Sequence, residues 1–316
     1  MNRDSKTSGQ YFILGYCILG SAIDVLLSGL LQSIELFVLL FWTFSCTWLV
    51  FLLVTLTVSP VKIYTLIQSY KLIILLNIST LGSWVGLFIG LKWTEPSIMV
   101  AIIFGLSPII SVLIELVTGK SIDAKTTVIT VMLAIIVTML VMLAVESTRS
   151  NVFHSGLTFT LMLSFVCILT SVCLVMGTYI AKKLSKMSFK AENIQSFRFP
   201  LLICVCYLLL PTPESLTEVR SDFWMYLPII VVLGNAIPIW MLQKGIERTS
   251  VIKTNIIINI TPCITFLLEL FDSTIAFNNM KLAVLVLLLL VMLINNDDVY
   301  IFISNKIKKV PKRIMN

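Results

Sequence analysis

Residues 107–116, SPIISVLIEL, and residues 261–270, TPCITFLLEL, decide the fold, because the chain writes nearly the same ten residues twice. The two stretches align without a gap at an offset of 154 positions, about half of the 316-residue chain. An internal repeat of this kind determines the architecture and is therefore sought first. The identical positions are Pro108/Pro262, Ile110/Ile264, Leu113/Leu267, Glu115/Glu269 and Leu116/Leu270.

The composition predicts an integral membrane protein. Apolar residues make up 58% of the chain, charged residues make up only 12%, and the mean hydropathy is +1.01. A soluble domain has about 25% charged residues. The seven cysteines all lie in apolar stretches and match no zinc or redox spacing, so we expect them to pack as small apolar side chains.

Ten apolar stretches are long enough to cross a bilayer, which takes about 20 residues each. None alternates polar and apolar residues as a membrane barrel does, so we expect an all-α integral membrane fold with ten transmembrane helices. The first span is read as a retained helix and not as a cleaved signal peptide. The stretches are 11–31, 36–58, 70–91, 97–118, 126–145, 156–180, 192–211, 223–243, 249–271 and 280–303.

The distribution of lysine and arginine predicts the orientation of these spans. With both termini in the cytoplasm, 17 of these residues fall in inside segments and 4 in outside joints; the other two, Arg198 and Lys253, lie within or at the edge of spans. Positive charge accumulates on the cytoplasmic side of membrane proteins. The net charge of +7 and the basic tail at 304–316 therefore suit anionic lipid head groups, and we expect no nucleic-acid binding.

Five spans per half is an odd number, so the second half would enter the membrane upside down. The predicted units are 1–147 and 148–303, followed by the tail. Inverted repeats are the architecture of many secondary transporters, whose substrate site lies near the midplane at the repeat interface. The repeat therefore indicates a carrier of small molecules.

The two repeated prolines, Pro108 and Pro262, fall near the middle of their spans. Proline removes a backbone hydrogen bond, and the freed carbonyl is tolerated beside neighbouring helices or a water-filled cavity. Hydroxyl residues surround both prolines, among them Ser111 and Thr265. We expect two hinges with a polar lining; a packing kink unrelated to substrate is the alternative.

Glu115 and Glu269 lie seven residues beyond the prolines, near the span ends. Because the repeats are inverted, Glu115 should lie near the cytoplasmic surface and Glu269 near the outer one. We interpret them as paired gates that close the cavity alternately. Solvated carboxylates at the interface are the alternative.

Four more polar residues are candidates for substrate contact or coupling. Asn255 and Asn259 share a helix face with Thr265, although asparagine can instead bond a neighbouring helix. Asp24 lies inside an apolar span, where a bare carboxylate costs at least about 2.5 kcal/mol, so it should hold a proton, bind substrate or contact a polar neighbour. Arg198 is either a cation at the cavity mouth or a side chain that snorkels to head groups.

The order of these features resembles the ten-helix EamA-type permeases of the drug/metabolite transporter superfamily. The resemblance covers nearly the whole chain and rests on GLFIGLKWTEPS, IMVAIIFGLSP and TGKSIDAK in the first half. In the second half it rests on AKKLSKMSF, QKGIERTS and IIINITP. It implies inverted five-helix repeats around a cavity, with helices 1, 3, 4, 6, 8 and 9 as its walls. It also implies transport of small metabolites without ATP. The chain departs from the family pattern at Gly119-Lys120 and Asp272-Ser273, where a Gly-Glu pair is common, and at Phe41, where an arginine is expected.

The leading interpretation is thus a secondary transporter of a small polar metabolite, such as an amino acid, coupled to a proton or to exchange. A nucleotide-sugar or sugar-phosphate antiporter and an organic-cation or drug exporter are the alternatives, and a receptor or scaffold is another class. An enzyme is not expected, since the sequence shows no cluster of catalytic or metal-binding residues, no cofactor motif and no P-loop. Short joints and Ile/Lys/Asn-rich usage suggest a bacterial inner membrane. The sequence does not define the oligomeric state.

Overall fold

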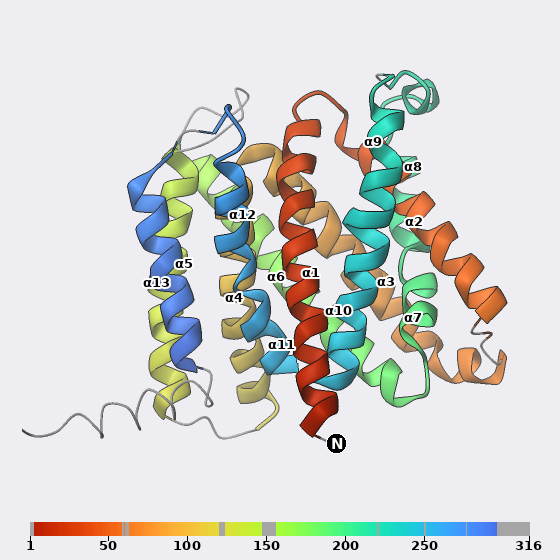
Figure 1. Ribbon diagram of the computed structural model, residues 1–316, viewed down its shortest axis with the longest axis horizontal. Helices are drawn as coiled ribbons and strands as arrows, with labels where there is room; N and C mark the ends of the chain where they lie inside the picture. The colour runs from red at the N-terminus through yellow and green to blue at the C-terminus, as the bar shows by residue number, and fades with distance from the viewer. Residues whose placement is uncertain are drawn as a thin grey trace, which may run out of the picture.

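The computed structural model describes residues 3–58, 60, 63–119, 124–146, 156–219, 221–249, 251–275 and 277–295. These residues form a bundle of helices (Figure 1), and no strand occurs among them. The all-α prediction is therefore confirmed for the described part of the chain. The basic tail predicted at 304–316 lies outside it.

Six long helices occupy the first part of the chain, and shorter helical segments follow. The long helices are α1 (Arg3–Leu30), α2 (Leu36–Val58), α3 (Ile63–Trp93), α4 (Pro96–Val117), α5 (Ala124–Glu146) and α6 (Leu157–Lys186). The next segments are α7 (Ala191–Arg198), α8 (Pro200–Leu208), the 3-10 turn η1 (Pro213–Leu216), α9 (Phe223–Ile229) and the π-helix η2 (Ile230–Ala236). The last are α10 (Ile237–Arg248), α11 (Val251–Ile258), α12 (Thr261–Glu269) and α13 (Asn279–Asn295).

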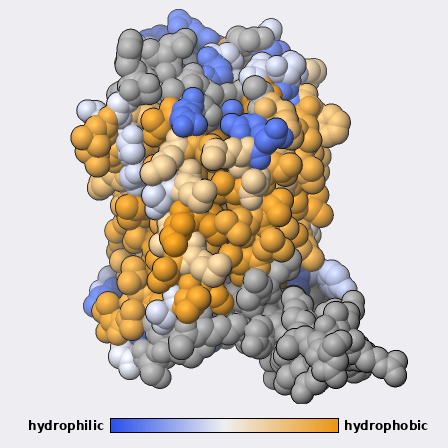
Figure 2. Space-filling model, turned by 90° about the vertical axis from the view of Figure 1, so that its left-hand side faces the viewer, coloured by the Kyte–Doolittle hydropathy of each residue, from blue (hydrophilic) through white to orange (hydrophobic). Residues whose placement is uncertain are grey.

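Within the described residues, seven helical runs are long and apolar enough to cross a membrane. They are α1 to α6 and the continuous run of α9, η2 and α10 over Phe223–Arg248. On the face formed by α5 and α13, apolar side chains make a broad belt with hydrophilic residues above it (Figure 2). The chain is thus built as an integral membrane protein. The other predicted spans, 192–211, 249–271 and 280–303, contain the pairs α7/α8 and α11/α12 and the shorter helix α13.

The break between α7 and α8 follows from Pro200. Proline has no N–H, so the carbonyl of Ser196 loses its helical partner; the indole of Trp48 donates to it instead, at 2.8 Å. The next carbonyl and N–H along the helix, those of Phe197 and Leu201, both bond the side chain of Asn77 in α3. The amide of Asn77 donates to the carbonyl of Phe197 and accepts from the N–H of Leu201. Side chains of α2 and α3 thus satisfy the backbone of the broken helix and end α7 at Arg198.

The two repeated prolines have different local structures. Pro108 lies inside α4, which continues through it, with the hydroxyls of Ser107 and Ser111 bonded to carbonyls one turn back. Pro262 instead begins α12, after a break that contains Asn259. The amide of Asn259 donates to the carbonyl of Asn255, and such side-chain bonds compete with the helical ladder.

The π-helix η2 lies between two prolines, Pro228 and Pro238. Pro238 cannot donate to the carbonyl of Gly234 in the α pattern, and the N–H of Ile237 bonds five residues back, to Val232. The amide of Asn235 also donates five residues back, to the carbonyl of Ile230 at 3.0 Å. Missing donors thus widen the helix at this point.

The most extensive helix pairings are α3 with α6 and α1 with α10. α4 packs against α5, α6 and α12, whereas α2 packs against α7 and α8, and α5 packs against α13. The α3–α6 crossing depends on glycine, since a Cβ added at Gly86 would lie 1.9 Å from Oγ1 of Thr170. The pairings place α1, α3, α4, α6 and α10 around the centre of the bundle.

Candidate functional site

The centre of the bundle contains a cavity lined mainly by apolar side chains. About 830 Å³ of space in the cavity and its open mouth together is free of protein atoms. The walls come from α1, α3, α4, α6, α7, η2, α10 and α12. The lining residues are Tyr16, Gly20, Ile23, Asp24, Ser83, Trp84, Leu87, Val100, Ile103, Phe104, Thr170, Leu174, Arg198, Gly234, Ile239, Leu242 and Thr261.

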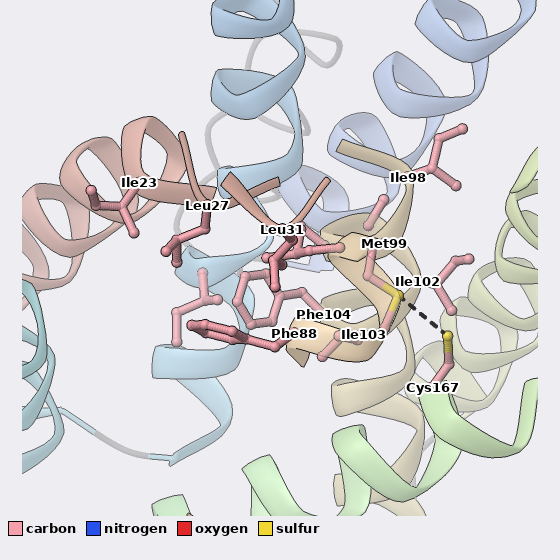
Figure 3. Close-up of a cluster of buried hydrophobic side chains, with 14 of the residues drawn as sticks. Ile23, Leu27, Leu31, Phe88, Ile98, Met99, Ile102, Ile103, Phe104 and Cys167 are labelled. Carbon is pink, nitrogen blue, oxygen red and sulfur yellow. Dashed lines mark hydrogen bonds between the residues drawn. The ribbon is translucent and has the colours of Figure 1, made fainter. Parts of the chain in front are cut away.

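Tightly packed apolar residues close one end of this cavity. Ile23 and Ile103 line the cavity. Leu27 and Met99 lie one turn away on α1 and α4, Leu31 follows directly after α1, and all three are fully buried. Figure 3 shows these side chains in one cluster with Phe88 and Phe104. The cavity is therefore sealed toward the C-terminal end of α1, opposite the N-terminus in Figure 1.

Asp24 is a buried carboxylate that faces the cavity. Its side chain is 9% exposed, and within the described part of the chain it makes no hydrogen bond or ion pair. Ionised carboxylates in apolar surroundings are normally paired, because removing the charge from water is costly. Asp24 thus offers an unused acceptor or proton site to a molecule in the cavity.

Arg198 is the cation of the same cavity, placed there because α7 ends at this residue. Its Nε donates to Oγ1 of Thr80 at 3.1 Å, and Nη1 donates to Oε1 of Gln195 at 3.1 Å. The guanidinium carbon lies 5.9 Å from the ring centre of Phe199. No carboxylate lies within 4 Å of it in the described residues. Neutral groups thus orient the guanidinium and leave its charge uncompensated.

Polar groups other than the two charges are few and dispersed around the walls. Hydroxyls come from Tyr16, Ser83, Thr170 and Thr261, and Oγ1 of Thr261 is buried without a hydrogen-bond partner in the structure. Trp84 supplies a large aromatic surface. The cavity can therefore hold a ligand that combines charged groups with an apolar body.

A chain of polar side chains leads from the cavity toward the C-terminus of α6. Gln195, which holds Arg198, donates to Oε1 of Gln243 at 3.4 Å, and Gln243 donates to Oγ of Ser185 at 3.1 Å. Both glutamines are buried. This chain links α7, α10 and α6 and fixes the position of Arg198.

Two of the six sequence-predicted substrate or coupling residues, Asp24 and Arg198, line this cavity together. The other four lie in the interface of α4 with α11 and α12. There the amide of Asn255 donates to Oγ of Ser111 at 3.1 Å, and Asn259 and Thr265 bond carbonyls of their own segments. Oδ1 of Asn259 is buried without a hydrogen-bond partner among the described residues.

The predicted hinge residues lie beside the cavity and not in its lining. Pro262 is buried and Pro108 is partly buried, and neither is a lining residue. Thr261, immediately before Pro262, does line the cavity.

The predicted gate residue Glu269 belongs to a buried charge network at the sealed end. Its carboxylate accepts from the N–H and the hydroxyl of Ser97, both at 2.6 Å, and from Nζ of Lys281 at 2.9 Å. Lys281 also pairs with Glu95 at 2.6 Å and lies 5.0 Å from the ring centre of Phe266. The network ties α4, α12 and α13 together. Glu115, its counterpart in the repeat, is half-buried near the other end of α4.

Sequence reasoning missed most of the lining, including Tyr16, Trp84 and Thr170. A polar or aromatic residue in an apolar helix gives no sign of which neighbour it faces. Gln195 could have been noted, because it lies one turn before Arg198 in the same segment. Among the described residues, no group of three or more His, Cys, Asp or Glu side chains could hold a metal ion.

Comparison with known proteins identifies a shared fold and no family. No family model matches the sequence, and no curated protein matches it. Solved structures do match, in 21 chains. One of them, described only as "Crystal structure of protein", aligns with a TM-score of 0.61 at 14% identity, over 94% of this chain and 97% of its own. The likeness is one of fold alone.

Proposed function

We propose that the protein is a secondary transporter that moves a small zwitterionic metabolite, such as an amino acid with an apolar side chain, by alternating access. The observation that carries the proposal is the presence of both Asp24 and Arg198 in the lining of one largely apolar cavity, where neither has a partner of opposite charge in the described residues. A zwitterion brings an ammonium group for Asp24 and a carboxylate for Arg198. The ligand itself would complete the electrostatics of the site.

The walls of the cavity suit a small amphipathic ligand. Pockets for small molecules combine apolar walls with a few placed polar groups. The apolar residues around Trp84 and Leu87 suit a hydrocarbon or aromatic side chain. A nucleotide-sugar would bring several negative charges to a site with one guanidinium, so it is less well supported.

Helix packing supports two inverted repeats, 1–147 and 148–303. An inverted repeat relates span 1 to span 6, span 2 to span 7, and so on to span 5 and span 10. The pairing of α3 (span 3) with α6 (span 6) then corresponds to the pairing of α10 (span 8) with α1 (span 1). These are the two most extensive pairings of the bundle. The pairings of α2 with α7 and α8, of α4 with α12, and of α5 with α13 map onto themselves.

Equivalent side chains also close equivalent helix ends. α3 and α10 both end in Gly-x-x-x-Thr, where the hydroxyls of Thr94 and Thr249 donate to the carbonyls of Gly90 and Gly245. Ser28 of α1 donates to the carbonyl of Leu91 in α3. Lys182 of α6, 154 positions beyond Ser28, donates to the carbonyl of Ile246 in α10, 155 positions beyond Leu91.

On this basis α7/α8, α11/α12 and α13 complete ten crossings, with both termini in the cytoplasm of a bacterial cell. The lysine and arginine bias supports that orientation. The resemblance of the sequence to EamA-type permeases agrees with it. The sealed end of the cavity would then face outward, with Glu269 as the closed outer gate and Glu115 as its inner counterpart.

Exchange across the membrane in proteoliposomes tests the function. Vesicles loaded with unlabelled amino acids of apolar side chain should take up the labelled compound by counterflow. Asp24→Asn and Arg198→Gln should each abolish uptake. The exposed residues Glu214 and Lys183 provide matched controls, since Glu214→Gln and Lys183→Gln should transport normally. Counterflow that survives both cavity variants would refute the proposed binding mode, and no exchange of any amino acid would refute the function.

An organic-cation exporter is the second candidate, because the unpaired Asp24 lies in the same cavity as the aromatic rings of Tyr16 and Trp84. The two variants separate the candidates. A cation exporter should lose transport of quaternary amines in Asp24→Asn and retain it in Arg198→Gln.

A further inference from the structure

A second pocket lies between the C-terminus of α6, the turn that follows it and α10. About 760 Å³ of space, counted up to its opening, is free of protein atoms. It carries four ammonium groups and one carboxylate, that of Glu247. The lining residues are Lys182, Ser185, Lys186, Ser188, Phe189, Lys190, Lys244 and Glu247.

Two of the lining side chains, Lys182 and Ser185, already have hydrogen-bond partners within the protein. Nζ of Lys182 donates to three carbonyls at the end of α10, those of Ile246, Glu247 and Thr249. Ser185 accepts from Gln243 and donates to the carbonyl of Ala181. These groups hold the pocket together and do not point to a ligand.

Two other lining groups have no partner among the described residues: the ammonium of Lys186 and the hydroxyl of Ser188. Lys186 follows Lys182 by one helical turn, a spacing at which like charges repel. Lys244 pairs with Glu247 only at 3.4 Å. Among the described residues, the ammonium of Lys186 thus has no partner and that of Lys244 has only a long contact with a carboxylate.

Ser188 is also strained. Among the described residues it is the one non-glycine residue with positive φ, at 70°. It follows the end of α6 in a turn closed by bonds from Ser188 N to Ser185 O and from Phe189 N to Leu184 O, both 3.3 Å. Glycine is the usual residue at such a position. A hydroxyl kept here at a conformational cost, facing a basic pocket, indicates a binding role.

We propose that this pocket binds a phosphate group through Lys186, Ser188 and Lys244. Its oxygens would accept from the hydroxyl and the two ammonium groups and relieve the repulsion among the lysines. Two sources carry this chemistry: the head group of an anionic phospholipid and free phosphate. The site is independent of the transport proposal, because it uses no residue of the central cavity.

The test uses the purified full chain in nanodiscs. Native mass spectrometry should detect a bound phosphatidylglycerol that is retained more strongly than phosphatidylcholine. Lys186→Gln should weaken this retention about fivefold, the contribution expected of one cation near an anionic lipid. Lys183→Gln, an exposed lysine of α6 outside the pocket, should not change it. Equal retention by Lys186→Gln and wild type would overturn the proposal.

Two substitutions at Ser188 separate binding from folding. Ser188→Ala removes the hydroxyl and keeps the strain, whereas Ser188→Gly removes both. Both variants should bind the phosphate less tightly, and Ser188→Gly should melt at or above the wild-type temperature. Unchanged binding in both would overturn the role of Ser188.

Inorganic phosphate distinguishes the sources. In nanodiscs of phosphatidylcholine alone, stabilisation by millimolar phosphate that is lost in Lys186→Gln would assign the site to a soluble phosphate. Stabilisation only by phosphatidylglycerol would assign it to a lipid head group. The absence of both effects would refute the site.

Discussion

Replacing Glu269 by glutamine should destabilise the protein by about 2–4 kcal/mol. The carboxylate is 1% exposed and receives hydrogen bonds from Ser97 and from the buried ammonium of Lys281. Hydrogen bonds to charged groups contribute about 1.5–3 kcal/mol each. Glutamine can still accept one bond from Ser97, so the main loss is the bond and charge facing Lys281. Lys281 keeps Glu95 as a partner, which holds the cost below the full penalty for an unpaired buried ion.

The assay can use the native cysteines. Cys17, Cys167 and Cys206 are buried and free, so a dye that fluoresces on reaction with thiols reports their exposure on heating. The expected loss corresponds to a fall of roughly 3–6 °C in melting temperature. Glu214→Gln, on the surface, is the control and should melt as the wild type does.

A double variant separates the ion pair from packing. The double variant with Glu269→Met and Lys281→Met should cost at least about 1 kcal/mol less than the sum of the two single changes. In the double variant both charges of the Glu269–Lys281 pair are removed, whereas each single change leaves one of them without this partner. A Glu269→Gln variant within about 0.5 kcal/mol of wild type would refute the reasoning. So would strict additivity of the two methionine changes.

Three further predictions test the fold by the same assay. Asn77→Ala should cost about 1–3 kcal/mol, because it frees both backbone groups bridged at the break before α8; a change below about 0.5 kcal/mol would contradict that role. Gly86→Ala should destabilise the chain by forcing α3 and α6 apart, whereas Gly29→Ala, with open space around it, should stabilise it by up to about 1 kcal/mol; equal effects would contradict the close approach. Lys182→Met should cost about 2–3 kcal/mol and Ser28→Ala about 0.5–1.5 kcal/mol, since they cap helix ends that the proposed repeat relates, with a charged and a neutral donor; the reverse order would argue against the proposed equivalence.

Residues that violate the apolar pattern could be identified from the sequence. Asp24 and Arg198 interrupt apolar runs, and the cost of a membrane-embedded charge marks them as candidates without any structure. That both side chains line one cavity could not be predicted from the sequence, because it depends on where α7 ends and how α1 packs against α10. The lining hydroxyls and rings gave no signal, since the same residues occur in ordinary helix packing.

The two prolines show where local patterns fail. Pro108 and Pro262 lie in similar sequence contexts, each after a hydroxyl residue, yet α4 continues through one and the chain breaks before the other. The difference lies outside the repeated motif: Asn259 in the second half aligns with Gly105 in the first. An asparagine that bonds its own backbone competes with the helix, and a glycine cannot.

Access to the central cavity from both sides of the membrane tests the central claim most directly. Ser83 lines the cavity beside Trp84, so Ser83→Cys places a thiol there. A membrane-impermeant maleimide applied to either side of oriented proteoliposomes, with modification located by peptide mass spectrometry, measures access. Alternating access predicts reaction from each side, slowed by the transported amino acid. Reaction from one side only, whatever the solute gradient, would contradict it.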